Sequence, residues 1–237
     1  MLIQVNSIFG SSMRLLAWLS IFSGSMAHAL SLEDFSTKDA NAGLKAALSQ
    51  GAGKAVDLLG RQDGFLGNPK VKIPLPESVQ KLEGMLRGFG MGKQADELVT
   101  TLNRAAEAAM PQAKVLLVNS IKQMSVEDAK SILSGGEGAA TAYFRKTTES
   151  PIAEKFKPIV RQAISKVKLA EKYDQFAGKA AKFGLVREQD AQLDNYVTQK
   201  ALDGLYLMIA EEEAAIRKNP AQATSQLVKK LFGAIPL

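Results

Sequence analysis

Apolar residues recur at spacings of three and four along most of the chain, which predicts α-helices and not strands. The clearest stretch covers residues 192–218 and carries on one face Leu193, Val197, Ala201, Leu205, Met208, Ala215 and Ile216. A second stripe runs from residue 93 to residue 121 and contains Pro111. Because a proline inside a helix removes a hydrogen bond and costs about 3 kcal/mol, we expect two helical segments that meet at an angle there.

Caps and glycine stops define the other predicted helices. They cover residues 37–59, 77–87, 125–135, 139–148, 169–183 and 223–232. Ser150 followed by Pro151 is typical of a helix start, so a further helix is expected to begin there and to bend at Pro158. About eight or nine helices with short connections predict an all-α fold, a single globular bundle over residues 30–237.

Residues 61–76 interrupt the helical pattern. Their first half is rich in turn formers, and the prolines at 74 and 76 push the residues before them toward extended geometry. We therefore expect a loop with a short extended segment. Two interpretations stay open: a strap packed over the helical core, or a binding loop in which Asp63 and Phe65 contact a ligand.

The first 29 residues have the three parts of a secretory signal peptide. Arg14 is their only charged residue, an apolar run follows over residues 15–22, and Ala27-His28-Ala29 matches an A-x-A cleavage site. The apolar run is much shorter than the ~20 residues of a membrane span. We expect cleavage after Ala29 and a periplasmic or secreted product without a transmembrane segment. Met13 is an alternative start of translation.

The chain has no cysteine, and its only histidine is His28, inside the predicted leader. Cleavage after Ala29 leaves neither imidazole nor thiol, the side chains most used for nucleophile activation, proton transfer near neutral pH and zinc ligation. The sequence therefore predicts no metal and no cofactor, and it favours a non-catalytic protein. Because two carboxylates can hydrolyse glycosidic bonds, a carboxylate-based hydrolase is the catalytic alternative.

The chain carries 30 Lys or Arg against 24 Asp or Glu, and the excess is local. Residues 145–182 hold ten Lys or Arg and four Asp or Glu. Such a run is typical of a solvated helical surface; the functional interpretation is a basic face for an anionic or envelope partner. Nucleic acid is not expected, because the segment has no DNA- or RNA-reading motif.

Several polar residues fall at positions that face the predicted core. Asn103 and Glu107 lie one helical turn apart, and Glu212 follows Met208 by four residues along an apolar stripe. A buried carboxylate is costly unless it is paired, so each needs a partner. The set forms either a polar network that fixes helix packing or a cleft that binds a ligand. The candidate ligand-binding residues are Asp63, Phe65, Asn103, Glu107, Tyr143, Arg145, Lys157, Glu212 and Arg217.

Four segments carry a family resemblance when they are taken together. They are residues 60–69 (GRQDGFLGNP), 71–76 (VKIPLP), 102–107 (LNRAAE) and 210–220 (AEEEAAIRKNP). With them the chain resembles, from about residue 31 to residue 232, a bacterial family known as domain of unknown function 4197. The resemblance implies an exported, mainly helical protein whose biochemical role is unassigned, and it supplies no catalytic residues.

The sequence favours an exported, non-catalytic helical protein that binds a ligand or an envelope component through a cleft between helices. One alternative is the carboxylate-based hydrolase. The other is a structural or interaction protein of the cell envelope, which the amphipathic segment at residues 223–232 favours.

Overall fold

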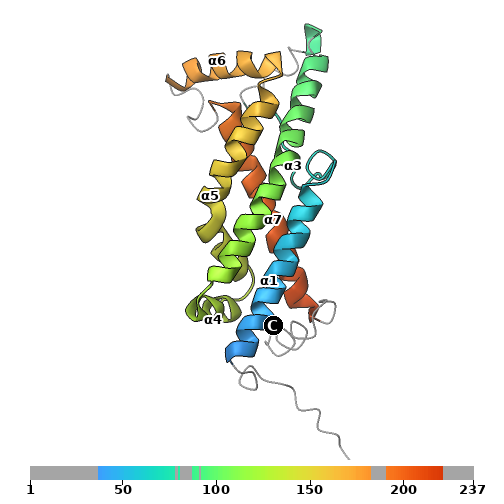
Figure 1. Ribbon diagram of the computed structural model, residues 1–237. Coiled ribbons are helices and arrows are strands. Elements are labelled where there is room, and N and C mark those ends of the chain that lie inside the picture. Colours follow the sequence, from blue (N-terminus) through green and yellow to red (C-terminus); the bar gives the residue numbers. More distant parts are fainter. Residues whose placement is uncertain (1–36, 78–79, 81–86, 91, 183–190, 221–237) are drawn as a thin grey trace, which may run out of the picture.

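The computed structural model describes residues 37–77, 80, 87–90, 92–182 and 191–220. These residues form an all-helical bundle whose elements are α1 (Thr37–Leu59), α3 (Gly92–Gln123), α4 (Val126–Ser134), α5 (Ala139–Ile164), α6 (Lys168–Lys182) and α7 (Leu193–Lys218). Figure 1 shows four long helices, α1, α3, α5 and α7, running alongside one another, with the short α4 at one end and α6 crossing the other end.

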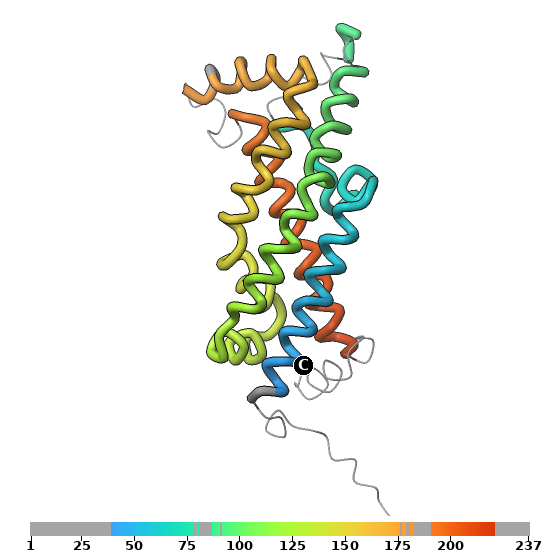
Figure 2. Tube along the Cα trace, viewed as in Figure 1, coloured from blue at the N-terminus to red at the C-terminus, as the bar shows by residue number. Residues whose placement is uncertain are grey.

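The four long helices close into a ring. α3 packs against α1 and α5, and α7 packs against the same two helices from the opposite side, as the tube in Figure 2 also shows. The enclosed core is aliphatic and aromatic, and its largest fully buried side chains include Leu44, Leu59, Leu98, Leu102, Met110, Leu117, Phe144, Ile152, Phe156 and Tyr206. Burial of each such side chain contributes roughly 1.5–3 kcal/mol, so this core is the main source of stability.

Six helices lie in the described residues, and the predicted count of eight or nine is not confirmed. The predicted helix at residues 77–87 lies largely outside the described residues. The one at residues 223–232 and the predicted leader lie wholly outside them. Residue 71 lies in a turn, and residues 72–76 form neither a helix nor a strand. None of the helices in the described parts of the chain is long and apolar enough to cross a membrane.

Two of the predicted helix breaks are wrong. α3 continues through Pro111, and α5 continues through both Pro151 and Pro158. Each proline lacks one N–H donor, but the side chains that flank it in the core are fully buried, among them Met110 before Pro111 and Ile152 after Pro151. Packing on both sides of the proline therefore outweighs the lost hydrogen bond.

The caps explain where several helices begin. Ser125 and Asp128 form the predicted capping box, with the Asp128 amide donating to Ser125 Oγ at 3.0 Å and the Ser125 amide to Asp128 Oδ2 at 3.0 Å. Helix α1 spans the predicted residues 37–59, and α7 begins one residue after its predicted start. α5 begins differently: its N-cap is Gly138 with φ +85°, which has no side chain to cap the helix.

Residues 60–76, which we call the strap, run across the bundle next to α3 and α7. Phe65, Val71, Ile73 and Leu75 of the strap are all buried. The strap approaches α7 closely at Gly204, where an added Cβ would lie 2.8 Å from Phe65 Cε1 and 3.2 Å from Val71 Cβ. A strap packed over the core is therefore the observed arrangement.

Candidate functional site

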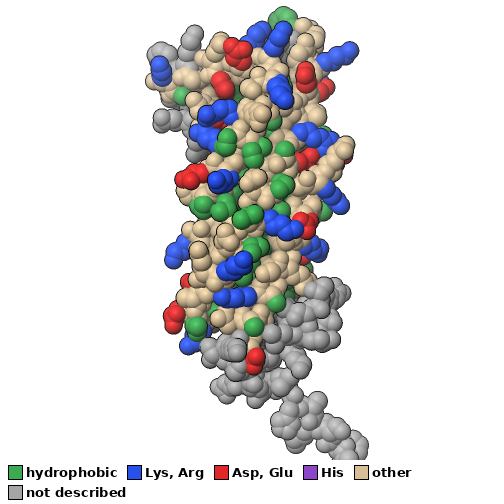
Figure 3. All heavy atoms as spheres, in the orientation of Figure 1, with side chains coloured by type: hydrophobic (Ala, Val, Ile, Leu, Met, Phe, Trp, Pro, Cys, Tyr) green, Lys and Arg blue, Asp and Glu red, His purple; other side chains and the backbone are tan. Residues whose placement is uncertain are grey.

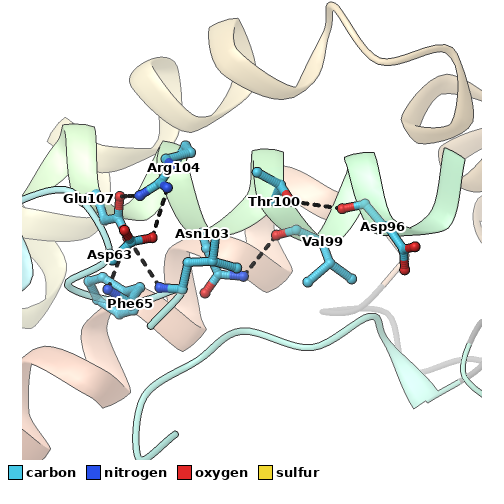
Figure 4. Close-up of polar contacts among 9 residues, drawn as sticks. Asp63, Phe65, Asp96, Val99, Thr100, Asn103, Arg104 and Glu107 are labelled. Carbon is cyan, nitrogen blue, oxygen red and sulfur yellow. Dashed lines mark hydrogen bonds and ion pairs between the residues drawn. The ribbon is translucent and has the colours of Figure 1, made fainter. Parts of the chain in front are cut away.

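Helix α3 holds the strap through two side chains that bind its backbone, Asn103 and Glu107, and Figure 4 shows the contact of Glu107 with Phe65. Asn103 Oδ1 accepts the Ile73 amide at 2.8 Å, and Asn103 Nδ2 donates to the Ile73 carbonyl at 2.8 Å. One turn later, Glu107 Oε1 accepts the amides of Phe65 at 3.0 Å and Leu66 at 3.1 Å. The two side chains therefore supply the hydrogen bonds that a neighbouring strand would give.

Arg104 completes this contact on the solvent side. Its Nη1 lies 2.6 Å from Glu107 Oε2, and its Nη2 lies 2.8 Å from Asp63 Oδ1 (Figure 4). The two carboxylates raise the pKa of the Arg104 guanidinium, chiefly through the Glu107 hydrogen bond. The structure thus brings together four predicted residues, Asp63, Phe65, Asn103 and Glu107, and uses their polar atoms to hold the strap.

A second buried pair closes the end of the bundle near α4. Glu213 accepts the Ala140 amide at 3.1 Å and the Thr141 amide at 2.9 Å, so α7 supplies the cap that Gly138 lacks. A carboxylate at a helix N-terminus is also favoured by the helix dipole. Arg217 binds Glu213 Oε1 through Nε at 3.1 Å and donates to the Ile132 carbonyl of α4 at 3.0 Å.

The prediction that Glu212 faces the core needs correction. Glu213 is the buried acid, whereas Glu212 lies 2.8 Å from the exposed ammonium of Lys54 on α1. The apolar face of α7 is broad, because Met208 and Ile209 are both buried. Glu212 and Glu213 follow them by four residues each, so the spacing alone does not show which of the two acids is buried. Gly138 has no side chain to cap α5, which indicates that another residue must accept the free amides at the start of this helix. The sequence does not show that Glu213 is that residue.

Tyr143 and Arg145 lie on different sides of α5. The Tyr143 hydroxyl donates to the Ser120 carbonyl at 2.9 Å and lines a polar cleft of about 410 Å³ between α3, α4 and α5. The Arg145 guanidinium lies 4.6 Å above the Tyr206 ring and 3.0 Å from Glu149. Burial raises the pKa of the Tyr206 phenol to about 12, which keeps this group neutral. Neither predicted residue meets the other.

Lys157 lines a cleft of about 380 Å³ between α5 and α7. Thr198 of α7 lines the same cleft, and its Oγ1 is buried without a hydrogen-bond partner. Lys157 comes one turn after Glu154, whose carbonyl has no intrahelical donor because Pro158 stands four residues later. This part of α5 and α7 therefore has hydrogen-bonding capacity that the fold does not use.

A cleft of about 620 Å³ lies between α5, α6 and α7. Its lining, which defines what we call the α5–α6–α7 cleft, consists of Arg161, Ile164, Ser165, Ala170, Glu171, Asp174, Gln192 and Asp194. Among the described residues, no group of three or more His, Cys, Asp or Glu side chains is placed to hold a metal ion.

Asp194 is the central acid of this cleft. Its Oδ2 accepts hydrogen bonds from Arg161 Nε at 2.8 Å and Arg161 Nη2 at 2.6 Å. Its Oδ1 is buried and has no hydrogen-bond partner. A buried polar atom without a partner costs about 1–3 kcal/mol, and more when the group is charged. The folded protein therefore holds an acceptor here that a bound donor would satisfy.

Asp174 of α6 is the second acid of the cleft. Its Oδ1 accepts the Leu193 amide at 2.9 Å, so it caps the start of α7 from another helix. Desolvation by burial raises the pKa of the Asp174 carboxyl, and the negative charge of Asp194 raises this pKa further. The cleft thus contains one acid with an orphan oxygen and another that holds its proton more tightly than usual.

Sequence reasoning missed Arg161, Asp174 and Asp194. Asp194 lies in the first turn of α7, where the helix dipole already favours an acid, so its position gave no indication of a binding site. Asp174 and Arg161 fall inside the basic segment at residues 145–182, where each counted only as charge. Their meeting depends on how α6 crosses α5 and α7, which no local spacing encodes.

Comparison with known proteins adds the family. No curated protein and no solved structure matches the chain. A family model described as a protein of unknown function, DUF4197, matches residues 34–233, which is most of the chain. The chain therefore belongs to the DUF4197 family, as its four characteristic segments predicted.

Proposed function

We propose that the protein is an exported, non-catalytic binding protein that takes a small polar ligand in the α5–α6–α7 cleft. The leader pattern at residues 1–29 supports export. The observation that carries the binding proposal is Asp194, which lines a cleft of about 620 Å³ and has a buried Oδ1 without a hydrogen-bond partner. Pockets for small ligands commonly measure about 300–1,000 Å³ and hold a few well-placed polar groups.

The nine predicted site residues all lie outside this cleft, and hydrogen bonds of the fold already use the polar atoms of several of them. The strap is held by hydrogen bonds to Asn103 and Glu107, and Glu107 pairs with Arg104. In the same way, Arg217 binds α4, and its partner Glu213 binds α5. A ligand there would have to displace hydrogen bonds that hold the fold. A ligand in the α5–α6–α7 cleft that donates to Asp194 would add a hydrogen bond without displacing any.

The geometry supports binding better than hydrolysis. Asp194 Oδ2 is committed to Arg161, and Asp174 Oδ1 is committed to the Leu193 amide. Each acid therefore has one oxygen engaged in holding helices together, whereas a hydrolytic pair must move a proton and stabilise a cationic transition state with free carboxylates.

A basic-face function at residues 145–182 stays a prediction. Two of the cations in this segment, Arg145 and Arg161, are paired with acids of α5 and α7. Figure 3 shows Lys and Arg spread along the visible face with Asp and Glu between them. That distribution favours a solvated surface, whereas the interaction role of residues 223–232 lies outside the described residues.

Native mass spectrometry of the protein tests the binding proposal. The full-length gene is expressed with its leader, and the product is purified gently from the periplasmic fraction. We expect cleavage after Ala29 and a population with additional mass from a retained small molecule. Lack of processing would contradict export.

A pair of serine variants locates the ligand. Ser165 lines the cleft at the end of α5 and donates to the Gln162 carbonyl at 3.1 Å; Ser134 ends α4 and donates to the Lys130 carbonyl at 2.9 Å. Both serines are exposed. Ser165→Trp should abolish the retained mass by filling the cleft, and Ser134→Trp should leave it unchanged. Equal retention by both variants, or no retained mass and no binding from extracts, would refute the proposal.

A further inference from the structure

We propose that the ligand of the α5–α6–α7 cleft is an organic cation whose primary ammonium group donates to Asp194 Oδ1. The inference rests on the proposed function, since it names the ligand class of the same cleft.

The lining is acidic although the chain has a net charge of +6. The groups that face the cleft are Arg161 from α5, Glu171 and Asp174 from α6, and Asp194 from α7. Both hydrogen bonds that Arg161 makes here go to the same oxygen of Asp194. The remaining carboxylates therefore repel an anion and attract a cation.

Asp194 supplies the specific contact. The residue lines the cleft and is only 5% exposed. Arg161 fixes its Oδ2, and its Oδ1 is buried without a hydrogen-bond partner. An ammonium group fits this arrangement because it carries three donors and a positive charge, and a charge-assisted hydrogen bond is about twice as strong as a neutral one. A hydroxyl would satisfy Oδ1 but would not offset the negative charge of Glu171 and Asp174, the acids of the lining that Arg161 does not pair with.

Asp174 couples the binding of a cation to pH. Burial and the charge of Asp194 raise the pKa of Asp174, and an ammonium group in the cleft would favour its ionised form. Binding then releases a proton, so the affinity for the cation rises as the pH rises through the pKa of Asp174.

Isothermal titration calorimetry with putrescine tests the proposal, with butane-1,4-diol as the uncharged analogue of the same length. We expect putrescine to bind the purified mature protein at least about tenfold more tightly than the diol. Nα-acetyl-lysine N-methylamide presents the same ammonium as a protein side chain. Whichever of the two amines binds more tightly identifies the source, a free amine or a partner's lysine.

Two variants assign the binding to the cleft. Asp194→Asn should weaken putrescine binding by about tenfold or more, whereas Asp57→Asn, which removes an exposed acid that pairs with Lys114, should leave binding unchanged. Asp174→Asn keeps an acceptor for the Leu193 amide. It therefore gives a second test that remains available if Asp194→Asn does not fold. The affinity of Asp174→Asn should depend much less on pH than that of the wild type, which rises as the pH rises through the raised pKa of Asp174.

Equal binding of the diol and putrescine would overturn the inference, and so would unchanged putrescine affinity in a folded Asp194→Asn protein. If native mass spectrometry finds a neutral or anionic molecule that Ser165→Trp excludes, the cation is wrong while the binding function stands. If nothing occupies the cleft, both are wrong.

Discussion

Thr198 carries a buried hydroxyl whose hydrogen-bonding capacity the fold does not use. We expect Thr198→Val to raise the free energy of unfolding by about 1 kcal/mol, because the near-isosteric side chain removes the desolvation cost of that hydroxyl. Thr148 is the matched control, since its hydroxyl donates to the Phe144 carbonyl at 2.7 Å and lies 2.9 Å from the Tyr206 hydroxyl. Thr148→Val should destabilise the protein. Urea unfolding curves measure both, and equal losses would contradict the assignment.

Gly204 is required for the close approach of the strap to α7. We expect Gly204→Ala to lower the free energy of unfolding by about 1–3 kcal/mol, because the new methyl group would overlap Phe65 and crowd Val71. Gly53 in α1 has no atom within 4 Å of its Cβ position. Gly53→Ala should therefore raise stability by roughly 0.5–1 kcal/mol through helix propensity. Thermal melts that shift in the same direction for both variants would refute the packing argument.

At the scale of elements, the buried Glu213–Arg217 pair links α7 to α4 and α5. Arg217→Met or Glu213→Leu alone should destabilise the protein by about 3–5 kcal/mol, because each leaves a buried charge without its partner. The double variant should lose clearly less than the sum of the two, since no isolated charge remains. A double-mutant cycle from urea unfolding measures the coupling. Strict additivity would show that the two side chains act independently.

How far the elements could be predicted depends on whether their determinants are local. The bounds of α1 and α7 and the capping box at Ser125 follow from spacing, caps and stops that lie within the element itself. The breaks expected at Pro111 and Pro151 did not occur, because tertiary packing decides whether a proline ends a helix. The contact of Glu213 with the Ala140 amide could not be predicted either, because these residues are distant in sequence and only tertiary packing brings them together.

At the scale of the whole molecule, the segments that carry the family resemblance coincide with contacts that hold the fold. Residues 60–69 and 71–76 form most of the strap, residues 102–107 contain the side chains that bind it, and residues 210–220 contain the Glu213–Arg217 pair. Arg161, Asp174 and Asp194 lie outside all four segments. The four segments therefore hold the architecture, whereas the chemistry of the α5–α6–α7 cleft comes from residues outside them.

The pH dependence of stability reports on the cleft without any ligand. The pKa of Asp174 is raised above its ordinary value, so the folded protein binds this proton more tightly than the unfolded chain. The stabilisation from Asp174 is therefore complete below the ordinary value and is lost as the pH rises through the raised value. Asp174→Asn removes this loss, so its stability relative to the wild type should increase as the pH rises from the ordinary value through the raised one.

Asp128 provides a control of opposite sign, because the hydrogen bonds from Ser125 lower the pKa of its carboxyl. Its stabilisation is present above the ordinary value and is lost as the pH falls through the lowered one. The stability of Asp128→Asn relative to the wild type should therefore decrease as the pH rises from the lowered value to the ordinary one. Urea unfolding at a series of pH values distinguishes the two slopes. Parallel stability profiles for Asp174→Asn and the wild type would show that Asp174 binds its proton equally in the folded and unfolded chains. That result would contradict a raised pKa of Asp174 in the folded protein.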